Sequence, residues 1–405
     1  MPQAFPPEVL AAAHAAAGRT PSDHADWTDR AFVTLDPASA TDLDQAFAIE
    51  TAGSDLILHY AIADVAWFVD ERGPIDAEAW TRGETLYLPD GKAGLYPPVL
   101  AEGAASLLPD GPRPAVVFSV RIAPDGAVKL DAATRAVICS HAKLAYATVR
   151  PEDLPAGFTE LSARIIAAEA ERGAARVDPP EQEVSAGPDG KLTLSFRDRH
   201  PSEDQNAALS LACNMAVADA RIAHGTGRFR GMAEPSDQAG RRLRHTARAF
   251  GIEWPSHATL TQFERMLDPA DPRAAALMLA IRRAGNGAGY QVFRPGETPW
   301  HAAVAAPYAH ATAPLRRLAD RYVVQATLAV ANGRPVPDHV TQAFAKLPKV
   351  MARADARAGQ RVGAFATDAA GRLWIGCYGE GGVGYEWPYG KIGGGVSIFD
   401  GKRLT

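Results

Sequence analysis

The sequence contains few cysteines and no long apolar run. Its three cysteines, Cys139, Cys213 and Cys377, are odd in number, far apart and without metal-ligand spacing, which predicts no disulfide partner and a reducing, cytoplasmic location. No window approaches the roughly 20 uncharged apolar residues that a membrane span needs, so we expect a soluble protein with no membrane partner. The N-terminus also lacks the basic region and apolar core of a secretory signal.

Basic residues are not in excess either, because 42 Lys and Arg stand against 47 Asp and Glu, a net charge of −5. A nucleic-acid partner would therefore have to be held by a local basic groove. The candidate basic stretches are RFR (228–230), RRLRHTAR (241–248) and Arg282–Arg283. The favoured reading of each is an ordinary solvated helix face.

The chain changes character along its length. Residues 7–30 predict a short helix and a linker, and residues 32–35, 46–50 and 56–69 predict strands, the last of them buried. Segments 96–145 alternate strand-like runs with turns. Helical periodicity marks residues 157–173, 204–224, 237–250, 272–284 and 315–331, weakens after Pro335, and gives way to a tail with 11 glycines in residues 371–401. We expect one large domain with a sheet-rich first half, a helix-rich second half and smaller flanks.

Three carboxylates gather in the stretch TLDPASATDLDQAF (34–47), on the expected loop between two strands. Asp36, Asp42 and Asp44 would repel one another there, and burial would raise their pKa values unless a cation lies among them. Oxygen ligands without nearby His or Cys favour Mg²⁺, with Mn²⁺ as the alternative. The other reading is a solvated acidic loop or a turn stabilised by its own Asp side chains.

Two adjacent arginines mark the stretch YAHATAPLRRLADRYVVQATLAVANG (308–333). Apolar residues at helical spacing and Pro314 predict a helix that begins near Pro314, with Arg316 and Arg317 in its first turn. The helix dipole disfavours positive charge there unless an anion is shared with the backbone N–H groups, an arrangement that suits a phosphate. Pairing with Asp320 or with surface acids is the alternative.

Two tyrosines are candidates for contact with a base. The stretch from residue 82 to 119 is rich in Pro and Gly and predicts a stiff loop that presents Tyr87. An aromatic ring held in this way can stack on a nucleobase. Core packing is the alternative for Tyr87 and for Tyr146 in HAKLAYATV.

These stretches, in this order, resemble the RNB catalytic domain of the RNase II and RNase R family. The resemblance covers residues from about 32 to 324, through FVTLDPASATDLDQAF, HYAIADVAWFV, RGETLYLPD, EGAASLLPDGPRPAV, HAKLAYATV and YAHATAPLRRLADRY. It implies an α+β fold in which helices surround a mixed or antiparallel sheet and an RNA channel leads to a buried metal site. It also implies hydrolytic, metal-dependent 3′→5′ degradation of single-stranded RNA to nucleoside 5′-monophosphates.

The resemblance assigns roles to particular residues, all by motif. Asp36, Asp42 and Asp44 would be the metal-binding and catalytic acids, with Gln45 beside them in the metal site. Arg316 would contact the scissile phosphate, and the implied RNA-binding residues are Tyr87, Tyr146, Tyr308, His310 and Arg317. In a two-metal scheme one ion activates the attacking water, the other stabilises the leaving 3′ oxygen, and the arginine neutralises charge on the phosphorane.

The sequence departs from the family pattern in two regions. Gln45 stands where most members have a fourth aspartate, and residues 349–368 contain no clear counterpart of a family glutamate. We expect a helix and linker in residues 1–30, the RNB domain in 31–358, and a Gly-rich tail in 359–405 that resembles one β-propeller repeat rather than the family's OB fold. A monomer is expected, and the rival reading is a catalytically weak RNA-binding protein on the same fold. A propeller-type ligand sensor would rest on the tail alone.

Overall fold

A closed barrel of five strands forms the centre of the computed structural model, which describes residues 4–88, 91–174, 181–186, 192–197, 199–284, 287–359, 364–367, 373–376 and 396–399. The barrel strands, in spatial order, are β1 (Ala25–Asp36), β2 (Gln45–Ala52), β3 (Asp55–Ala63), β6 (Pro112–Ile122) and β7 (Val128–Ala145). Neighbouring strands are antiparallel except β1 and β7, whose parallel pairing closes the barrel. The sheet is therefore mixed, as expected for an α+β fold.

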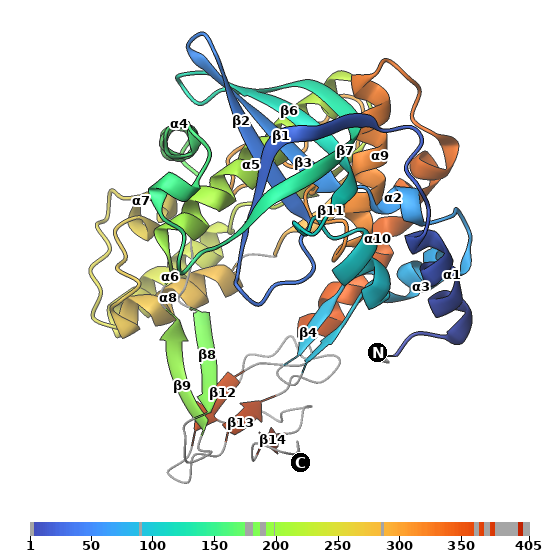
Figure 1. The fold of residues 1–405 in the computed structure, drawn as a ribbon. Coiled ribbons are helices and arrows are strands. Elements are labelled where there is room, and N and C mark those ends of the chain that lie inside the picture. The colour runs from blue at the N-terminus through green and yellow to red at the C-terminus, as the bar shows by residue number, and fades with distance from the viewer. Residues whose placement is uncertain are drawn as a thin grey trace.

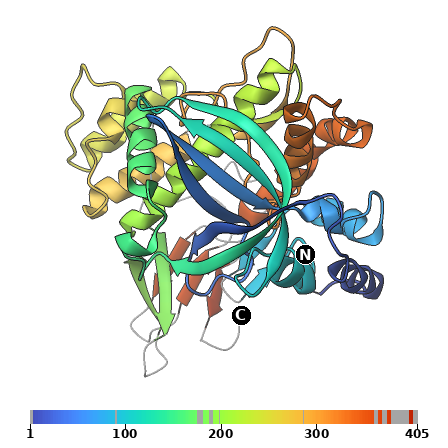
Figure 2. The same ribbon diagram turned by 45° about the horizontal axis from the view of Figure 1, so that its top comes forward.

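Helices surround the barrel. They are α1 (Pro7–Ala17), α2 (Val65–Phe68), α3 (Pro74–Arg82), α4 (Phe158–Glu171), α5 (Pro201–Ala223), α6 (Asp237–Ala249), α7 (Leu260–Glu264), α8 (Pro272–Ala284), α9 (Leu318–Ala331) and α10 (Asp338–Gly359). In Figures 1 and 2, α4 and α5 lie along one side of the barrel, α9 along another, and α6–α8 form a separate group far from α1 and α3. None of the described helices combines the length and the apolar character that a membrane span requires.

Short strands complete the described structure. They are β4 (Leu86–Leu88) with β5 (Gly91–Ala93), β8 (Glu181–Ala186) with β9 (Leu192–Arg197), β10 (Arg228–Gly231) with β11 (Gly289–Val292), and β12 (Ala364–Thr367), β13 (Leu373–Gly376) and β14 (Val396–Phe399). Apart from β12–β14, the Gly-rich tail lies outside the described residues. The expected division at residues 30 and 358 stays a prediction.

The apolar strands pack on both faces. Every residue of β3 from Leu56 to Ala63 is buried, because one face points into the barrel and the other is covered by helices. Phe47, Tyr60 and Phe118 are among the fully buried side chains of this core. At about 1.5–3 kcal/mol for each large apolar side chain, this burial supplies the main stabilisation of the barrel. A second, smaller apolar cluster joins α6, α7 and α8.

Three expectations from the sequence are wrong. The strand predicted for 56–69 ends at Ala63, because the Asp64 carboxylate accepts the Trp67 N–H and starts α2. The helix predicted from Pro314 begins at Leu318, because Arg317 is extended and forms an antiparallel bridge with Glu84. The linker expected up to residue 30 is shorter, because β1 already begins at Ala25; after Pro335, where the weak pattern predicts no element, the chain forms the long helix α10.

Candidate active site

The acidic stretch spans the end of one barrel strand and the start of the next. Asp36 is the last residue of β1, Asp42 and Asp44 lie in the connection, and Gln45 is the first residue of β2. Because β1 and β2 are antiparallel neighbours, this connection folds back at one end of the barrel.

The fold braces the backbone of this connection. Lys143 Nζ donates to the carbonyls of Ala38 (2.9 Å) and Ala40 (2.6 Å). The buried Ser106 hydroxyl donates to the Thr41 carbonyl (2.8 Å) and accepts the Leu43 N–H (2.9 Å). These contacts come from distant segments, so the backbone of the connection is held in place by the end of the barrel, although residues 37–39 and 41 are exposed to solvent.

Asp44 joins the acidic stretch to the arginine segment. Asp44 is 4% exposed, and its carboxylate accepts the Leu315 N–H at 2.7 Å, a contact across 271 positions of sequence. Its other oxygen lies 3.4 Å from Arg316 Nε, and the Arg316 side chain remains 46% exposed. The structure therefore places a half-exposed guanidinium beside a buried carboxylate.

Burial shifts two of the three carboxyl groups strongly. Desolvation raises the pKa of Asp44 to about 7, although Arg316 and the Leu315 N–H oppose the shift. Desolvation also raises the pKa of Asp36 to about 7, and Asp42 adds to this shift while Arg316 and Lys143 oppose it. Carboxyl groups with raised pKa values are those that a bound cation would return to the charged form.

The two arginines have different surroundings. The Arg317 guanidinium pairs with the fully buried Asp320, with Nη2 2.7 Å from Oδ2, and the same carboxylate accepts the Ala313 N–H at 2.9 Å. This is the pairing that the alternative reading of the sequence allowed. Arg316, which precedes it, turns to Asp44 instead.

The β4–β5 hairpin carries Tyr87 and Lys92 to Asp42. The Tyr87 side chain is 62% exposed, and its hydroxyl lies 3.4 Å from Asp42 Oδ2. Lys92 Nζ lies 3.5 Å from Asp42 Oδ1 and 2.8 Å from Glu102 Oε1. The core-packing alternative for Tyr87 is excluded by its exposure. Sequence reasoning missed Lys92, although the turn signal PDG in RGETLYLPDGKAG predicts a hairpin that would return it towards Tyr87.

Tyr146 follows the end of β7 and lies next to Asp36. Its N–H donates to the Asp36 carbonyl (3.3 Å), and its hydroxyl accepts from Asn206 Nδ2 (2.9 Å). Burial, and then the nearby Asp36, raises the pKa of Tyr146 to about 12. Tyr146 is half-buried, so it both packs against the core and lies beside the acidic residue Asp36.

Tyr308 and His310 belong to an aromatic cluster rather than to the acidic stretch. Their ring centroids are 5.4 Å apart, Asn214 Nδ2 donates to the Tyr308 hydroxyl (3.2 Å), and His310 Nδ1 lies 2.9 Å from the Tyr290 hydroxyl. Burial, and then Arg317, lowers the pKa of His310 well below its usual value. This cluster reaches the acidic stretch through Thr312, whose carbonyl accepts from Gln45 Nε2.

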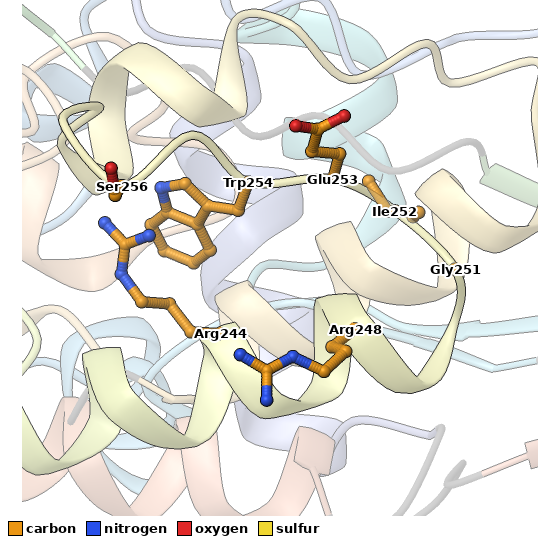
Figure 3. Close-up of a pocket in the computed structure, with 7 residues that line it drawn as sticks. All are labelled: Arg244, Arg248, Gly251, Ile252, Glu253, Trp254 and Ser256. Carbon is orange, nitrogen blue, oxygen red and sulfur yellow. The ribbon is translucent and has the colours of Figure 1, made fainter.

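The basic stretches differ in exposure. Arg228 is buried in β10 with its guanidinium 3.7 Å from the Tyr290 ring centroid, so RFR is not a solvated helix face. In RRLRHTAR, Arg244 stacks at 4.3 Å on Trp254 and donates to the Ala258 carbonyl (2.9 Å). Figure 3 shows Arg244 and Trp254 at a pocket whose lining also includes Arg248. The pocket is lined by residues of α6 and of the segment 251–256 that follows it, and none of the three aspartates belongs to the lining.

The acidic stretch offers carboxylate oxygens as donors for a divalent cation. Across the described parts of the chain, no three His, Cys, Asp or Glu side chains converge as a ready-made metal site. Mg²⁺ is commonly held by only one or two carboxylates, with waters and substrate phosphates completing its shell. The electrostatically coupled Asp36 and Asp42 fit that mode of binding.

Comparison with known proteins gives consistent matches. The family model described as RNB domain matches residues 24–332. Ribonuclease R 1 of Lactococcus lactis is 27% identical over 378 residues, 85% of this chain but 45% of that protein. Exoribonuclease 2 of Yersinia enterocolitica is 39% identical over 123 residues, 30% of this chain and 19% of that protein. The chain therefore spans less than half the length of these relatives.

Solved structures agree on the fold. Apo RNase R of Mycoplasma genitalium aligns with a TM-score of 0.74 and 23% identity, over 86% of this chain and 59% of that one. Yeast Ssd1, described as a pseudonuclease, aligns with a TM-score of 0.65 and 16% identity, over 88% of this chain and 50% of that one. Since the family model covers most of the sequence, from before the barrel to the end of α9, the chain belongs to the RNB domain family.

Proposed function

We propose that this protein is a metal-dependent exoribonuclease that hydrolyses single-stranded RNA from the 3′ end and releases nucleoside 5′-monophosphates. The observation that carries the proposal is the contact of buried Asp44 with the Leu315 N–H and the Arg316 guanidinium. It unites two motifs that lie far apart in sequence and that both suit phosphodiester chemistry. The names of the curated relatives, ribonuclease R and exoribonuclease 2, support the same reading.

Asp36, Asp42 and Asp44 are the residues that would hold Mg²⁺, or Mn²⁺, with Gln45 beside them. When bound, the ion would lower the pKa of a water ligand and neutralise charge on the phosphate. Gln45 contributes less than an aspartate would, because its amide adds no charge and its Nε2 already donates to the Thr312 carbonyl. Only its Oε1 is left to face a cation.

The protein groups would act by binding and orientation. The half-exposed Arg316 can donate two parallel N–H groups to a phosphate, and Asp44 holds its Nε side. A guanidinium positioned there would stabilise charge that develops on the phosphorane. Bidentate contact explains why arginine suits this position better than lysine.

The aromatic residues would hold the end of the RNA. Tyr87 is exposed beside Asp42, so its ring is available to stack on the 3′-terminal base. Tyr146 lies beside Asp36, where it would line the path to the acids. Tyr308, His310 and Arg317 would contribute from the neighbouring cluster, and an RNA channel, a monomeric state and a cytoplasmic location remain predictions.

The test is incubation of the purified protein with 5′-labelled single-stranded RNA, with Mg²⁺ or with EDTA, and separation of the products on a denaturing gel. A ladder that shortens from the 3′ end only with Mg²⁺ is expected. Asp44→Asn should leave the RNA full length while it still binds, with Asp125→Asn, in a turn far from the acids, as the control. Intact cleavage by Asp44→Asn would reject the assignment.

A second candidate is an RNA-binding protein that has lost catalysis on the same fold. The engagement of Gln45 with Thr312 favours it, because the amide weakens the metal site. The description of Ssd1 as a pseudonuclease shows that the fold can be found without the activity. Full-length RNA in the presence of Mg²⁺ or Mn²⁺, together with retained binding, would support this candidate.

A further inference from the structure

The side chain of Lys92 lies against the acidic stretch. Lys92 Nζ lies between Asp42 Oδ1 (3.5 Å) and Glu102 Oε1 (2.8 Å), and all three side chains are largely sheltered, at 31%, 17% and 29% exposure. Glu102 is held in turn by the Thr41 hydroxyl, 3.1 Å from its Oε2. The ammonium therefore has fixed partners on both sides and lies close to a predicted metal ligand.

The three aspartates differ in how many contacts they have. Asp42 is engaged by Lys92 and the Tyr87 hydroxyl, and Asp44 is engaged by the Leu315 N–H and Arg316. Within the described residues, the Asp36 carboxylate accepts no hydrogen bond, although the charge of Asp42 raises its pKa. Asp36 is therefore the carboxylate that a divalent ion can approach without displacing another group.

Charge balance also favours a single divalent ion. With a cation bound, the carboxyl groups of Asp36, Asp42, Asp44 and Glu102 are all charged and face the cations of Lys92, Arg316 and Lys143, which leaves one net negative charge. One divalent ion and the single negative charge of a phosphodiester would bring this neighbourhood to neutrality. A second divalent ion would leave two uncompensated positive charges in a partly buried site, where such charge is costly.

We infer that the ammonium of Lys92 takes the place of a second divalent cation at Asp42. The chain then binds one divalent ion, on the Asp36 side of the stretch, and Lys92 supplies the second positive charge beside the RNA phosphate. The inference rests on the proposed function for the phosphate, but the ion count does not depend on catalysis. Gln45 fits the same scheme, because a site for one ion does not need a fourth carboxylate.

The ion count can be measured directly. The whole chain is titrated with Mn²⁺, and the free ion is quantified by electron paramagnetic resonance. We expect one ion per chain for the wild type and for Lys92→Arg, and two for Lys92→Met, in which Asp42 and Glu102 lose their shared cation. Lys129→Met is the matched control, because the Lys129 side chain is 77% exposed and its ion pair with Asp131 is long, at 3.7 Å. This variant should bind one ion per chain.

Two ions or none in the wild type would overturn the inference, whatever the variants do. A count that stays at one in Lys92→Met, with its melting curve unchanged, would also overturn it. The gel assay of RNA cleavage distinguishes a failure of this inference from a failure of the proposed function. One bound ion without RNA cleavage would reject the exoribonuclease but leave the role of Lys92 in place. Cleavage with two bound ions would support the exoribonuclease and reject the role of Lys92.

Discussion

Methionine substitutions at the two adjacent arginines should affect different properties, because the side chains have different partners: Arg317→Met should lower stability, and Arg316→Met should weaken RNA binding. Arg317→Met leaves the carboxylate of Asp320, which is 0% exposed, with the Ala313 N–H as its remaining hydrogen-bond donor among the described residues. Removal of one partner of a buried ion pair typically costs about 3–5 kcal/mol. We therefore expect the free energy of unfolding to fall by that amount.

Arg316→Met removes a side chain that is 46% exposed and whose ion pair with Asp44 is partly screened by solvent. The expected change in the free energy of unfolding is about 1 kcal/mol or less. If Arg316 contacts phosphate, the lost charge-assisted hydrogen bonds cost about 1.5–3 kcal/mol of binding. The RNA dissociation constant should then rise by roughly 10- to 150-fold.

The assays are urea unfolding followed by circular dichroism, and fluorescence anisotropy with single-stranded RNA in EDTA, which prevents cleavage. Arg334→Met, at an exposed position after α9, is the control and should change stability by less than about 0.5 kcal/mol. The reasoning is refuted if Arg317→Met unfolds within about 1 kcal/mol of wild type. Because Arg317 is paired with Asp320, its contribution to RNA binding should be smaller than that of the more exposed Arg316, so an equal loss of RNA affinity in both variants would refute the separate roles.

Three further results are expected. Tyr87→Ala should weaken RNA binding by about 1–3 kcal/mol per stacked base without a change in melting temperature, and Tyr87→Phe should retain binding; an unchanged anisotropy titration for Tyr87→Ala would exclude stacking. Asp44→Asn should lower the single-turnover cleavage rate by at least about 10²-fold in Mg²⁺, and a rate near that of wild type would contradict its role. The third result concerns pH in EDTA, where burial raises the pKa of folded Asp44 to about 7, against 3.8 in the unfolded chain. Between these two pH values the folded state binds more protons than the unfolded state. The free energy of unfolding of the wild type should therefore fall, relative to that of Asp44→Asn, as pH rises from 3.8 to about 7. Urea unfolding across that range measures the difference, and a difference that stays constant would show that Asp44 titrates normally.

Local sequence determined much of the secondary structure and the chemical character of the site. The helices predicted for 157–173, 237–250 and 272–284 correspond to α4, α6 and α8, because an apolar stripe at helical spacing has few other ways to be buried. The three aspartates and the two arginines are visible as residues of the right chemistry. The ordered motifs were enough to indicate the RNB family, which the family model then confirmed.

Tertiary contacts decided where the elements end. Periodicity alone favoured a helix start at Pro314, but pairing of Arg317 with Asp320 and its bridge to Glu84 hold residues before Leu318 out of the helix. Asp64 ended a run that is apolar in sequence up to Val69, because a capping carboxylate can begin a helix inside such a run. Local patterns cannot contain contacts between segments that are hundreds of residues apart.

The sequence by itself therefore determined which residue types are present and which local structures they prefer. Only the closed barrel decided which of them meet, because the parallel pairing of β1 with β7 and the return of residues 312–317 bring distant groups to one end. Asp44 acquired its raised pKa, and Arg316 and Arg317 their different partners, from that packing. Lys92 came to lie beside Asp42 for the same reason, since burial and proximity are properties of the folded chain.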